Sequence, residues 1–249
     1  MNRGSPSGIR SGLEIIASGL RKSFGIPRRK SRLPSPLDLL IATILSQNTN
    51  DINSHKAFTD LKSSFPDLRV LADVSPRRIE PLIKVGGIAN KKSKVIAQVV
   101  REIDQRFGKF DAMSLRKIER EVLVELLRSL DGVGYKTASC VLLFSLGDND
   151  AFPVDTHVHR ILNRIGIVDQ KTPDKTYLAV RNNIPHGRGY ELHLNLIKFG
   201  RKTCKAQRPL CYECGLSDVC RWEGKTMRQL ESKNENRGKD VEFMLLENV

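Results

Sequence analysis

The amino-acid sequence predicts an all-α fold, and three observations support that class. Apolar residues recur at i, i+3 and i+4 in most segments, which is the spacing of a helix with one buried face. No segment sustains the alternation of apolar and polar residues that a half-buried strand requires. The short alternation in "FPVDTHVHRIL" also suits a helix that begins near Asp155, because aspartate is a preferred N-cap residue.

The predicted helices follow a polar N-terminal stretch, residues 1–12, which we expect to be frayed. Residues 13–24 have helical apolar spacing, and a basic, proline-containing linker occupies residues 25–36. The helical pattern then recurs over 36–47, 51–65, 75–86, 91–108, two tightly joined helices within 114–130, 136–147, 154–165, 173–183 and 189–201. From Lys225 onward the periodicity is lost until the last few residues, and we expect a loosely held tail.

The composition favours a polyanionic partner. The chain of 249 residues has 42 Lys and Arg against 28 Asp and Glu, a formal charge of +14. Such an excess is typical of nucleic-acid binding, with an anionic membrane surface as the second candidate. No apolar run approaches the roughly 18 residues of a transmembrane helix, and the N-terminus lacks the apolar core of a signal peptide. We therefore expect a soluble, intracellular protein that acts on nucleic acid.

The segment "LDGVGYKTASCVLLF", residues 130–144, has a glycine loop followed by Lys-Thr. A nucleotide-binding P-loop would need four residues between two glycines, lysine directly after the second, and a strand in front. Here Tyr135 separates Gly134 from Lys136, and the preceding residues have a helical pattern. A helix-hairpin-helix fits better: Gly132 and Gly134 would expose backbone amides to a DNA phosphate, and Val133 would fill the space between the helices. The alternative is an ordinary turn between two helices.

Four of the five cysteines lie within seventeen residues, in the spacing C-x6-C-x2-C-x5-C. They are Cys204, Cys211, Cys214 and Cys220. In an intracellular chain such a cluster indicates metal binding more than disulfides, and the spacing alone suits either one zinc ion or one [4Fe–4S] cluster. Cys140 lies apart in an apolar helix and is expected to be a buried apolar residue.

In this order and separation, "LDGVGYKTA", "FPVDTHVHR" and the cysteine loop resemble the endonuclease III family of DNA glycosylases, within the helix-hairpin-helix-GPD superfamily. The resemblance covers roughly residues 36–223. It also extends to "ILSQNTND", residues 44–51, which is similar to the family's segment that faces the lesion and its orphaned partner base.

This resemblance implies two helical lobes with a DNA-binding cleft between them. Residues 1–35 would be an N-terminal helix and linker packed with the iron–sulfur lobe, and residues 36–150 a six-helix, barrel-like lobe with the helix-hairpin-helix. Residues 151–224 would provide C-terminal helices and the [4Fe–4S] loop, and residues 225–249 the tail. Membership of the family would favour the iron–sulfur cluster over zinc at the four cysteines.

The resemblance also implies roles for Lys136 and Asp155. Taken alone, Lys136 could be a solvated cation near phosphate and Asp155 an N-cap. Their positions match the family's nucleophile and essential carboxylate. A neutral lysine amine would attack the sugar C1′ and expel the base, and the carboxylate would stabilise the positive charge that develops on the sugar.

Removal of a base from a duplex also requires extrusion of the nucleotide, and side chains must fill the gap that is left. By similarity to the family, Gln47, Asn48 and Ile88 are candidates for this role. The alternatives are that Gln47 and Asn48 simply end a helix and that Ile88 belongs to the core. Further basic residues are expected to contact phosphates, with a solvated face as the alternative for each: Arg28, Arg29, Lys30, Lys91, Lys92 and Lys94.

The function that these features predict is removal of damaged, oxidised pyrimidines from double-stranded DNA, followed by β-elimination at the abasic site. We expect a cytoplasmic, nucleoid-associated monomer with no membrane partner. One alternative is a uracil or thymine mismatch glycosylase; another, from a different class, is a non-catalytic DNA-binding protein with a zinc site. The sequence departs from some relatives at Tyr135, where they have a basic residue, whereas the retained Lys136 favours the bifunctional enzyme.

Overall fold

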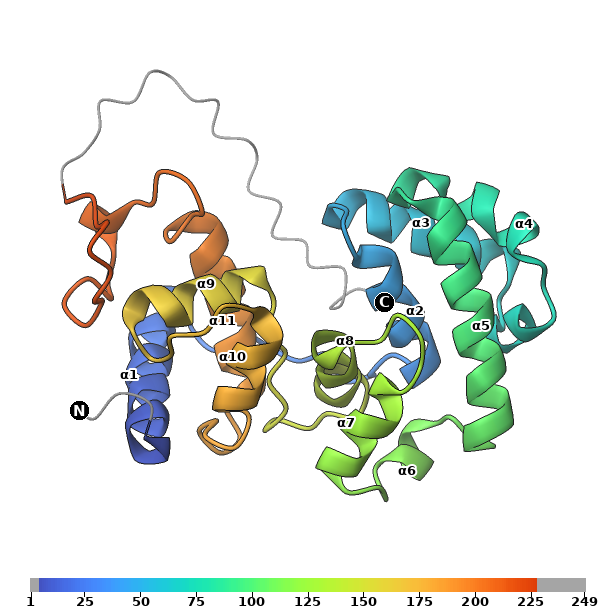
Figure 1. Ribbon diagram of the computed structural model, residues 1–249, viewed down its shortest axis with the longest axis horizontal. Helices are drawn as coiled ribbons and strands as arrows, with labels where there is room; N and C mark the ends of the chain where they lie inside the picture. Colours follow the sequence, from blue (N-terminus) through green and yellow to red (C-terminus); the bar gives the residue numbers. More distant parts are fainter. Residues whose placement is uncertain (1–4, 228–249) are drawn as a thin grey trace. The chain divides into compact units, whose positions relative to one another are not determined.

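The computed structural model describes residues 5–227, and these residues are helical with no β-strand (Figure 1). The predicted all-α class is therefore confirmed. The described residues form two compact units, one from residues 5–29 and 148–227 and the other from residues 30–147. Within the described part of the chain, no helix is long and apolar enough to cross a bilayer. The predicted tail, from residue 228 onward, lies outside the described residues.

The first unit is formed by both ends of the described chain. Its elements are α1 (Pro6–Phe24), α9 (Thr156–Ile165), α10 (Pro173–Val180), α11 (Gly189–Lys202) and the short 3-10 helix η4 (Cys211–Glu213). Helix α11 packs against both α1 and α9, and α10 packs against α9 (Figure 1). Eleven residues of α11 are buried, because it packs against α1 on one side and α9 on another.

An ion pair with a buried carboxylate joins α1 and α11 within this unit. Glu191 of α11 accepts a hydrogen bond from Arg21 Nε of α1 at 2.8 Å and another from Arg188 Nη2 at 3.0 Å. Burial alone would raise the pKa of Glu191, but the hydrogen bonds from the two guanidinium groups outweigh it and lower that pKa. The carboxylate is thus stabilised in its charged form where α1 meets α11.

The second unit contains the remaining helices. They are α2 (Pro36–Ser46), α3 (Asp51–Ser64), η1 (Leu68–Ala72), α4 (Pro76–Ile79), η2 (Glu80–Gly86), α5 (Ala89–Phe107), α6 (Ala112–Leu115), α7 (Arg120–Arg128), α8 (Tyr135–Cys140) and the π-helical turn η3 (Val141–Ser145). Helix α2 is apolar on all sides, and every residue in it except Asp38 and Ser46 is buried. It packs against α3, α5 and α8, so it forms the centre of this unit.

The structure corrects two details of the sequence prediction. Residues 6–12, expected to be frayed, belong to α1, and Ser5 caps it. The Ser5 hydroxyl accepts a hydrogen bond from the Gly8 amide at 3.2 Å, Pro6 begins the helix, and Ile9 is buried. The segment 75–86 is a short α-helix followed by a 3-10 helix rather than one α-helix. Pro81 explains this change, because it lacks the amide that would continue the α-helical hydrogen bonds.

Candidate functional site

The glycine loop is a tight turn between α7 and the helical segment that α8 and η3 form together. Gly132 has φ +73°, and a Cβ placed on it would lie 2.8 Å from the Val95 side chain of α5. The position therefore requires glycine for its backbone conformation and for its space. Val133 is buried, and its amide donates to the Leu130 carbonyl at 3.2 Å. Gly134 is the N-cap of α8, and a Cβ on it would meet no atom within 4 Å.

Lys136 is the second residue of α8 and is half-buried. Tyr135, Thr137 and Ala138 around it are buried and fix the first turn of the helix. Among the described residues of its own unit, the Lys136 amine has no hydrogen-bond or ion-pair partner. The first turn of α8 thus fixes the backbone of Lys136, and its amine is available to an external group.

Asp155 lies in the other unit, where it is the N-cap of α9 and is half-buried. Its Oδ1 accepts a hydrogen bond from the Val158 amide at 2.8 Å, so the capping role expected for an aspartate before a helix is present. The second carboxylate oxygen has no hydrogen-bond partner among the described residues of that unit. Capping therefore uses one oxygen and leaves the other available.

The two histidines that follow Asp155 are held by neighbouring side chains. His157 Nδ1 lies 3.1 Å from Arg160 Nη2, and His159 Nδ1 lies 2.8 Å from the Thr176 hydroxyl. Burial lowers the pKa of both imidazoles. Both rings are thus part of the packing around α9.

Two exposed residues, Asn48 and Ile88, have left-handed backbone conformations. Gln47 ends α2, as one of the two alternatives predicted, and its side-chain amide donates to the Gly132 carbonyl at 3.1 Å. Asn48 follows with φ 53°, and Ile88 has φ 51° with 55% of its surface exposed. The interpretation of Ile88 as a core residue is therefore wrong. A β-branched residue with positive φ is a strained outlier, and such strain is concentrated at functional positions.

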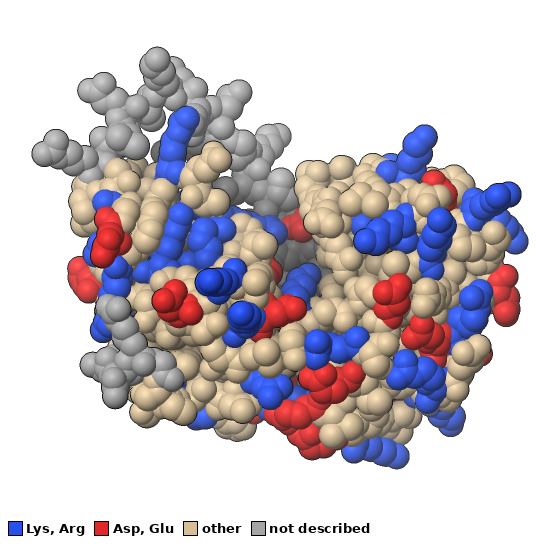
Figure 2. Space-filling view, in the orientation of Figure 1, with Lys and Arg blue, Asp and Glu red and all other residues tan. Residues whose placement is uncertain are grey.

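The hydrogen bond from Gln47 and the contact between Gly132 and Val95 join three segments of this unit: the end of α2, the start of α5 and the hairpin. The sequence-predicted DNA-binding residues lie in the hairpin, directly after α2 or directly before α5: Gln47, Asn48, Ile88, Gly132, Val133 and Gly134. Lysine and arginine side chains are also spread over the visible face of this unit (Figure 2). Lys92 is an exception, because it is buried, and the expectation that it contacts phosphate is wrong.

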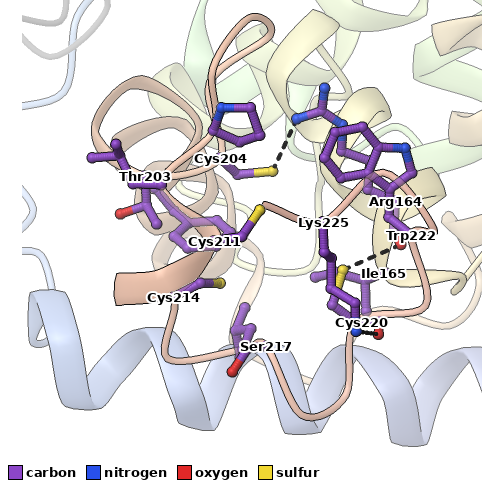
Figure 3. Close-up of a pocket in the computed structure, with 14 residues that line it drawn as sticks. Arg164, Ile165, Thr203, Cys204, Cys211, Cys214, Ser217, Cys220, Trp222 and Lys225 are labelled. Carbon is purple, nitrogen blue, oxygen red and sulfur yellow. Dashed lines mark hydrogen bonds between the residues drawn. The ribbon is translucent and has the colours of Figure 1, made fainter. Parts of the chain in front are cut away.

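The four clustered cysteines line a single pocket in the first unit, and none of them forms a disulfide (Figure 3). They lie on the loop after α11, which η4 and short turns shape. Burial raises the pKa of the Cys214 thiol, and the negative charges of the other three cysteines add to that effect. Within residues 5–227, however, no group of three or more His, Cys, Asp or Glu side chains is arranged so that it could hold a metal ion.

Two arginines of α9 support this loop, and the sequence analysis did not identify them. Arg160 donates to the Cys204 carbonyl at 2.9 Å. Arg164 donates to the Lys205 carbonyl at 2.7 Å and lies 3.5 Å from Cys204 Sγ, while its guanidinium stacks 4.0 Å from the centre of the Trp222 ring (Figure 3). Their spacing of four residues on one helix face, before a cysteine-rich loop, is a signal that could have identified them.

Comparison with known proteins agrees with these features. Residues 41–186, more than half of the chain, match the family described as HhH-GPD superfamily base excision DNA repair protein. Endonuclease III of Thermotoga maritima is 36% identical over 208 residues, which cover 84% of this chain and 92% of that protein. Endonuclease III of Escherichia coli is 29% identical over 214 residues, covering 86% of this chain and 96% of that protein.

Solved structures of endonuclease III with DNA have a similar fold. A non-covalent endonuclease III–DNA complex matches with a TM-score of 0.71 and 26% identity, over 85% of this chain and 95% of that one. A trapped endonuclease III–DNA covalent intermediate, an estranged-adenine complex, matches with a TM-score of 0.72 over the same shares. The helical fold, the lysine-bearing hairpin and these matches agree: the chain belongs to the endonuclease III family of DNA glycosylase/AP lyases, within the HhH-GPD superfamily of base excision DNA repair proteins.

Proposed function

We propose that this protein removes oxidised pyrimidines from double-stranded DNA as a monomer, with Lys136 as the nucleophile and Asp155 as the stabilising carboxylate. The observation that carries the proposal is the Lys136 amine, which is held at the start of α8 beside the glycine turn with no partner in its own unit. The formal charge of +14 supports a DNA substrate.

The proposed reaction uses one amine for both steps. The neutral Lys136 amine attacks C1′ and its nitrogen forms a bond to that carbon, while the N-glycosidic bond breaks and the base leaves with the electron pair and is protonated. The sugar ring opens to a Schiff base. Loss of a proton from C2′ then supplies the electrons that expel the 3′ phosphate, and water hydrolyses the Schiff base to return the free amine.

Asp155 contributes the charge that the first step needs. Cleavage of the glycosidic bond develops positive charge on the sugar, and a carboxylate near it stabilises that charge. The Asp155 oxygen that does not cap α9 is the one we assign to this role, because Oδ1 is already bonded to the Val158 amide. The N-cap also fixes the orientation of the carboxylate, which limits the cost of reorganisation during the reaction.

The hairpin and the two strained residues would serve the DNA around the reaction. Gly132 and Gly134 leave the backbone of the turn accessible, so that its amides can bind a DNA phosphate whatever the base sequence. Val133 stays in the protein interior and supports the turn. Gln47, Asn48 and Ile88 would fill the space that the extruded nucleotide leaves.

We infer that the cysteine pocket holds a [4Fe–4S] cluster rather than zinc. The residues fit this group: four thiols line one apolar pocket, and the basic side chains of Arg160 and Arg164 offset negative charge beside it. A tetrahedral zinc site would bring all four sulfurs to about 2.3 Å from one atom. Four thiols in one pocket suit either group, and the choice of the cluster rests on the similarity of this chain to endonuclease III. When bound, the cluster would cross-link the loop and supply a redox-active centre.

Measurement of iron, zinc and acid-labile sulfide in the purified protein tests this assignment. We expect iron and sulfide with the absorbance of a cluster, and the loss of both in Cys214→Ser. A colourless protein that contains stoichiometric zinc would contradict it.

Borohydride trapping tests the catalytic proposal. Duplexes with one oxidised pyrimidine, one uracil or one thymine–guanine mismatch are incubated with the enzyme, and base release, strand cleavage and covalent capture are measured. Borohydride reduces the Schiff base to a stable amine, so we expect capture with the oxidised pyrimidine, its loss in Lys136→Gln and its retention in the surface variant Lys117→Gln. Capture that persists in Lys136→Gln would refute the role of this lysine. Release of uracil or thymine but not of the oxidised pyrimidine would refute the proposed substrate and indicate a mismatch glycosylase.

A further inference from the structure

Lys92, near the start of α5, is a buried lysine without an acidic partner. Only 5% of its surface is exposed. Its Nζ donates to the Leu45 carbonyl at 2.7 Å and to the Gly86 carbonyl at 2.8 Å. Across residues 5–227 these carbonyls are the two polar partners of its side chain, which forms no ion pair. Burial lowers its pKa, as expected for a cation removed from water. A buried charge is costly, so its retention requires an explanation.

The two carbonyls explain what Lys92 does to the backbone. Leu45 is the second-last residue of α2, and Gly86 is the last residue of η2. The final carbonyls of a helix have no partner within the helix and lie at the negative end of its dipole, where a lysine is favoured. Lys92 therefore caps two helix ends with one ammonium. The ends are adjacent, since a Cβ on Gly86 would lie 3.9 Å from the Leu45 carbonyl oxygen.

Each capped helix end leads directly into a strained, exposed residue. Asn48 follows Leu45 by three positions, and Ile88 follows Gly86 by two. Their φ angles are 53° and 51°, and Gly87 between the cap and Ile88 also has a positive φ of 70°. Left-handed residues other than glycine persist only where the surrounding structure holds them. The two hydrogen bonds of Lys92 are placed to hold both.

We propose that Lys92 is a positioning residue for nucleotide extrusion: it fixes the Asn48 turn and the Ile88 turn at a set separation, so that both meet the DNA together. This inference rests on the proposed function, because it assigns Lys92 to the step in which the nucleotide leaves the duplex. Lys92 touches no substrate. It acts through the carbonyls of Leu45 and Gly86, and the Gln47 bond to Gly132 extends the same rigid assembly to the hairpin.

The test compares Lys92→Met with the wild type and with Lys117→Met. Methionine fills the volume of the lysine stem without its charge or donors. Lys117 is an exposed lysine of the same unit, so its variant controls for loss of one positive charge. Hydrogen exchange of the backbone amides is measured first in the free proteins. We expect faster exchange in the segments around Asn48 and Ile88 in Lys92→Met only.

Single-turnover base release is then measured on two duplexes, one with the lesion in a full pair and one with the lesion in a mismatch that is already unstacked. Misplacement by about 1 Å can reduce a rate about 100-fold. We expect a loss of about tenfold to 100-fold on the paired lesion, a smaller loss on the mismatched one, and unchanged duplex affinity. Lys92→Arg, which keeps the charge and donors, should restore part of the rate.

Three results would overturn the inference: unchanged exchange in both segments, equal rate losses on the two duplexes, or weaker DNA binding with an unchanged rate. If Lys92→Met does not fold, Lys92→Gln, which keeps a donor on a shorter chain, replaces it in both measurements. Failure of the wild type to release any base would instead refute the proposed function and the extrusion role with it. The exchange measurement would still decide whether Lys92 holds the two segments.

Discussion

Replacement of Ile88 by glycine should separate stability from function. The left-handed conformation at φ 51° costs a non-glycine residue about 1–2 kcal/mol, which glycine would recover. Against this, glycine loses about 0.5–1 kcal/mol of backbone entropy. The side chain is 55% exposed, so its removal forfeits only part of the roughly 1.5–3 kcal/mol of a fully buried side chain, about 1 kcal/mol. We therefore expect the free energy of unfolding of Ile88→Gly to lie within about 1 kcal/mol of the wild type.

Two further variants make this expectation specific. Ile88→Ala keeps the strained conformation, so it should be no more stable than Ile88→Gly, the reverse of the usual order. Ile83, five residues earlier in η2, is fully buried, and Ile83→Ala should cost about 2–5 kcal/mol. Urea unfolding of all three variants measures these differences, and the dependence of the free energy of unfolding on urea concentration is compared among them.

The activity of Ile88→Gly should change far more than its stability. In the proposed role, Ile88 fills the duplex where the base is unstacked, a step that costs a few kcal/mol, and glycine offers no apolar side chain for it. A loss of about 1.4–2.7 kcal/mol in the transition state corresponds to about a tenfold to 100-fold slower single-turnover release. The reasoning is refuted if Ile88→Gly is destabilised as much as Ile83→Ala, or if it releases base at the wild-type rate.

Three other predictions concern residues described above. Asp155→Asn should keep the cap on α9, so its free energy of unfolding should lie within about 0.5 kcal/mol of the wild type, whereas that of Asp155→Ala should fall by about 1 kcal/mol. Both variants should lose base release. An active Asp155→Asn would contradict the role of the carboxylate. Gly134→Ala has room for its Cβ, so it should fold normally but bind DNA less tightly. The free energy of unfolding of Gly132→Ala should fall by at least about 1 kcal/mol, because its backbone is left-handed. Equal unfolding midpoints for the two variants would disprove this. The pKa of Glu191 is lowered in the folded state, so its ion pair stabilises the protein above the unfolded pKa of about 4.3, and this contribution is lost as the pH falls through the folded pKa. Between pH 7 and 3, the free energy of unfolding of Glu191→Gln should therefore depend less on pH than that of the wild type. Parallel curves for the two proteins would argue against the assignment.

Local rules account for most of what the sequence predicted correctly. Apolar periodicity located the helices, and capping chemistry located their starts, including Asp155 before α9. The same rules missed the start of α1, where Ser5 and Pro6 form a cap in a stretch that composition alone describes as polar. They also missed the break in the segment 75–86, although Pro81 was a visible signal.

The sequence by itself determined the all-α class, the family, the lysine of the hairpin and the four cysteines, because these depend on residue type and spacing along the chain. Only the tertiary structure decided which of three neighbouring lysines is buried: Lys91 and Lys94 are exposed, whereas Lys92 lies under the ends of α2 and η2. It also decided that Ile88 is exposed and strained and that Gln47 bonds to the hairpin. The physical reason is that burial and backbone strain are set by contacts between residues that are distant in the chain, and short-range periodicity carries no information about such contacts.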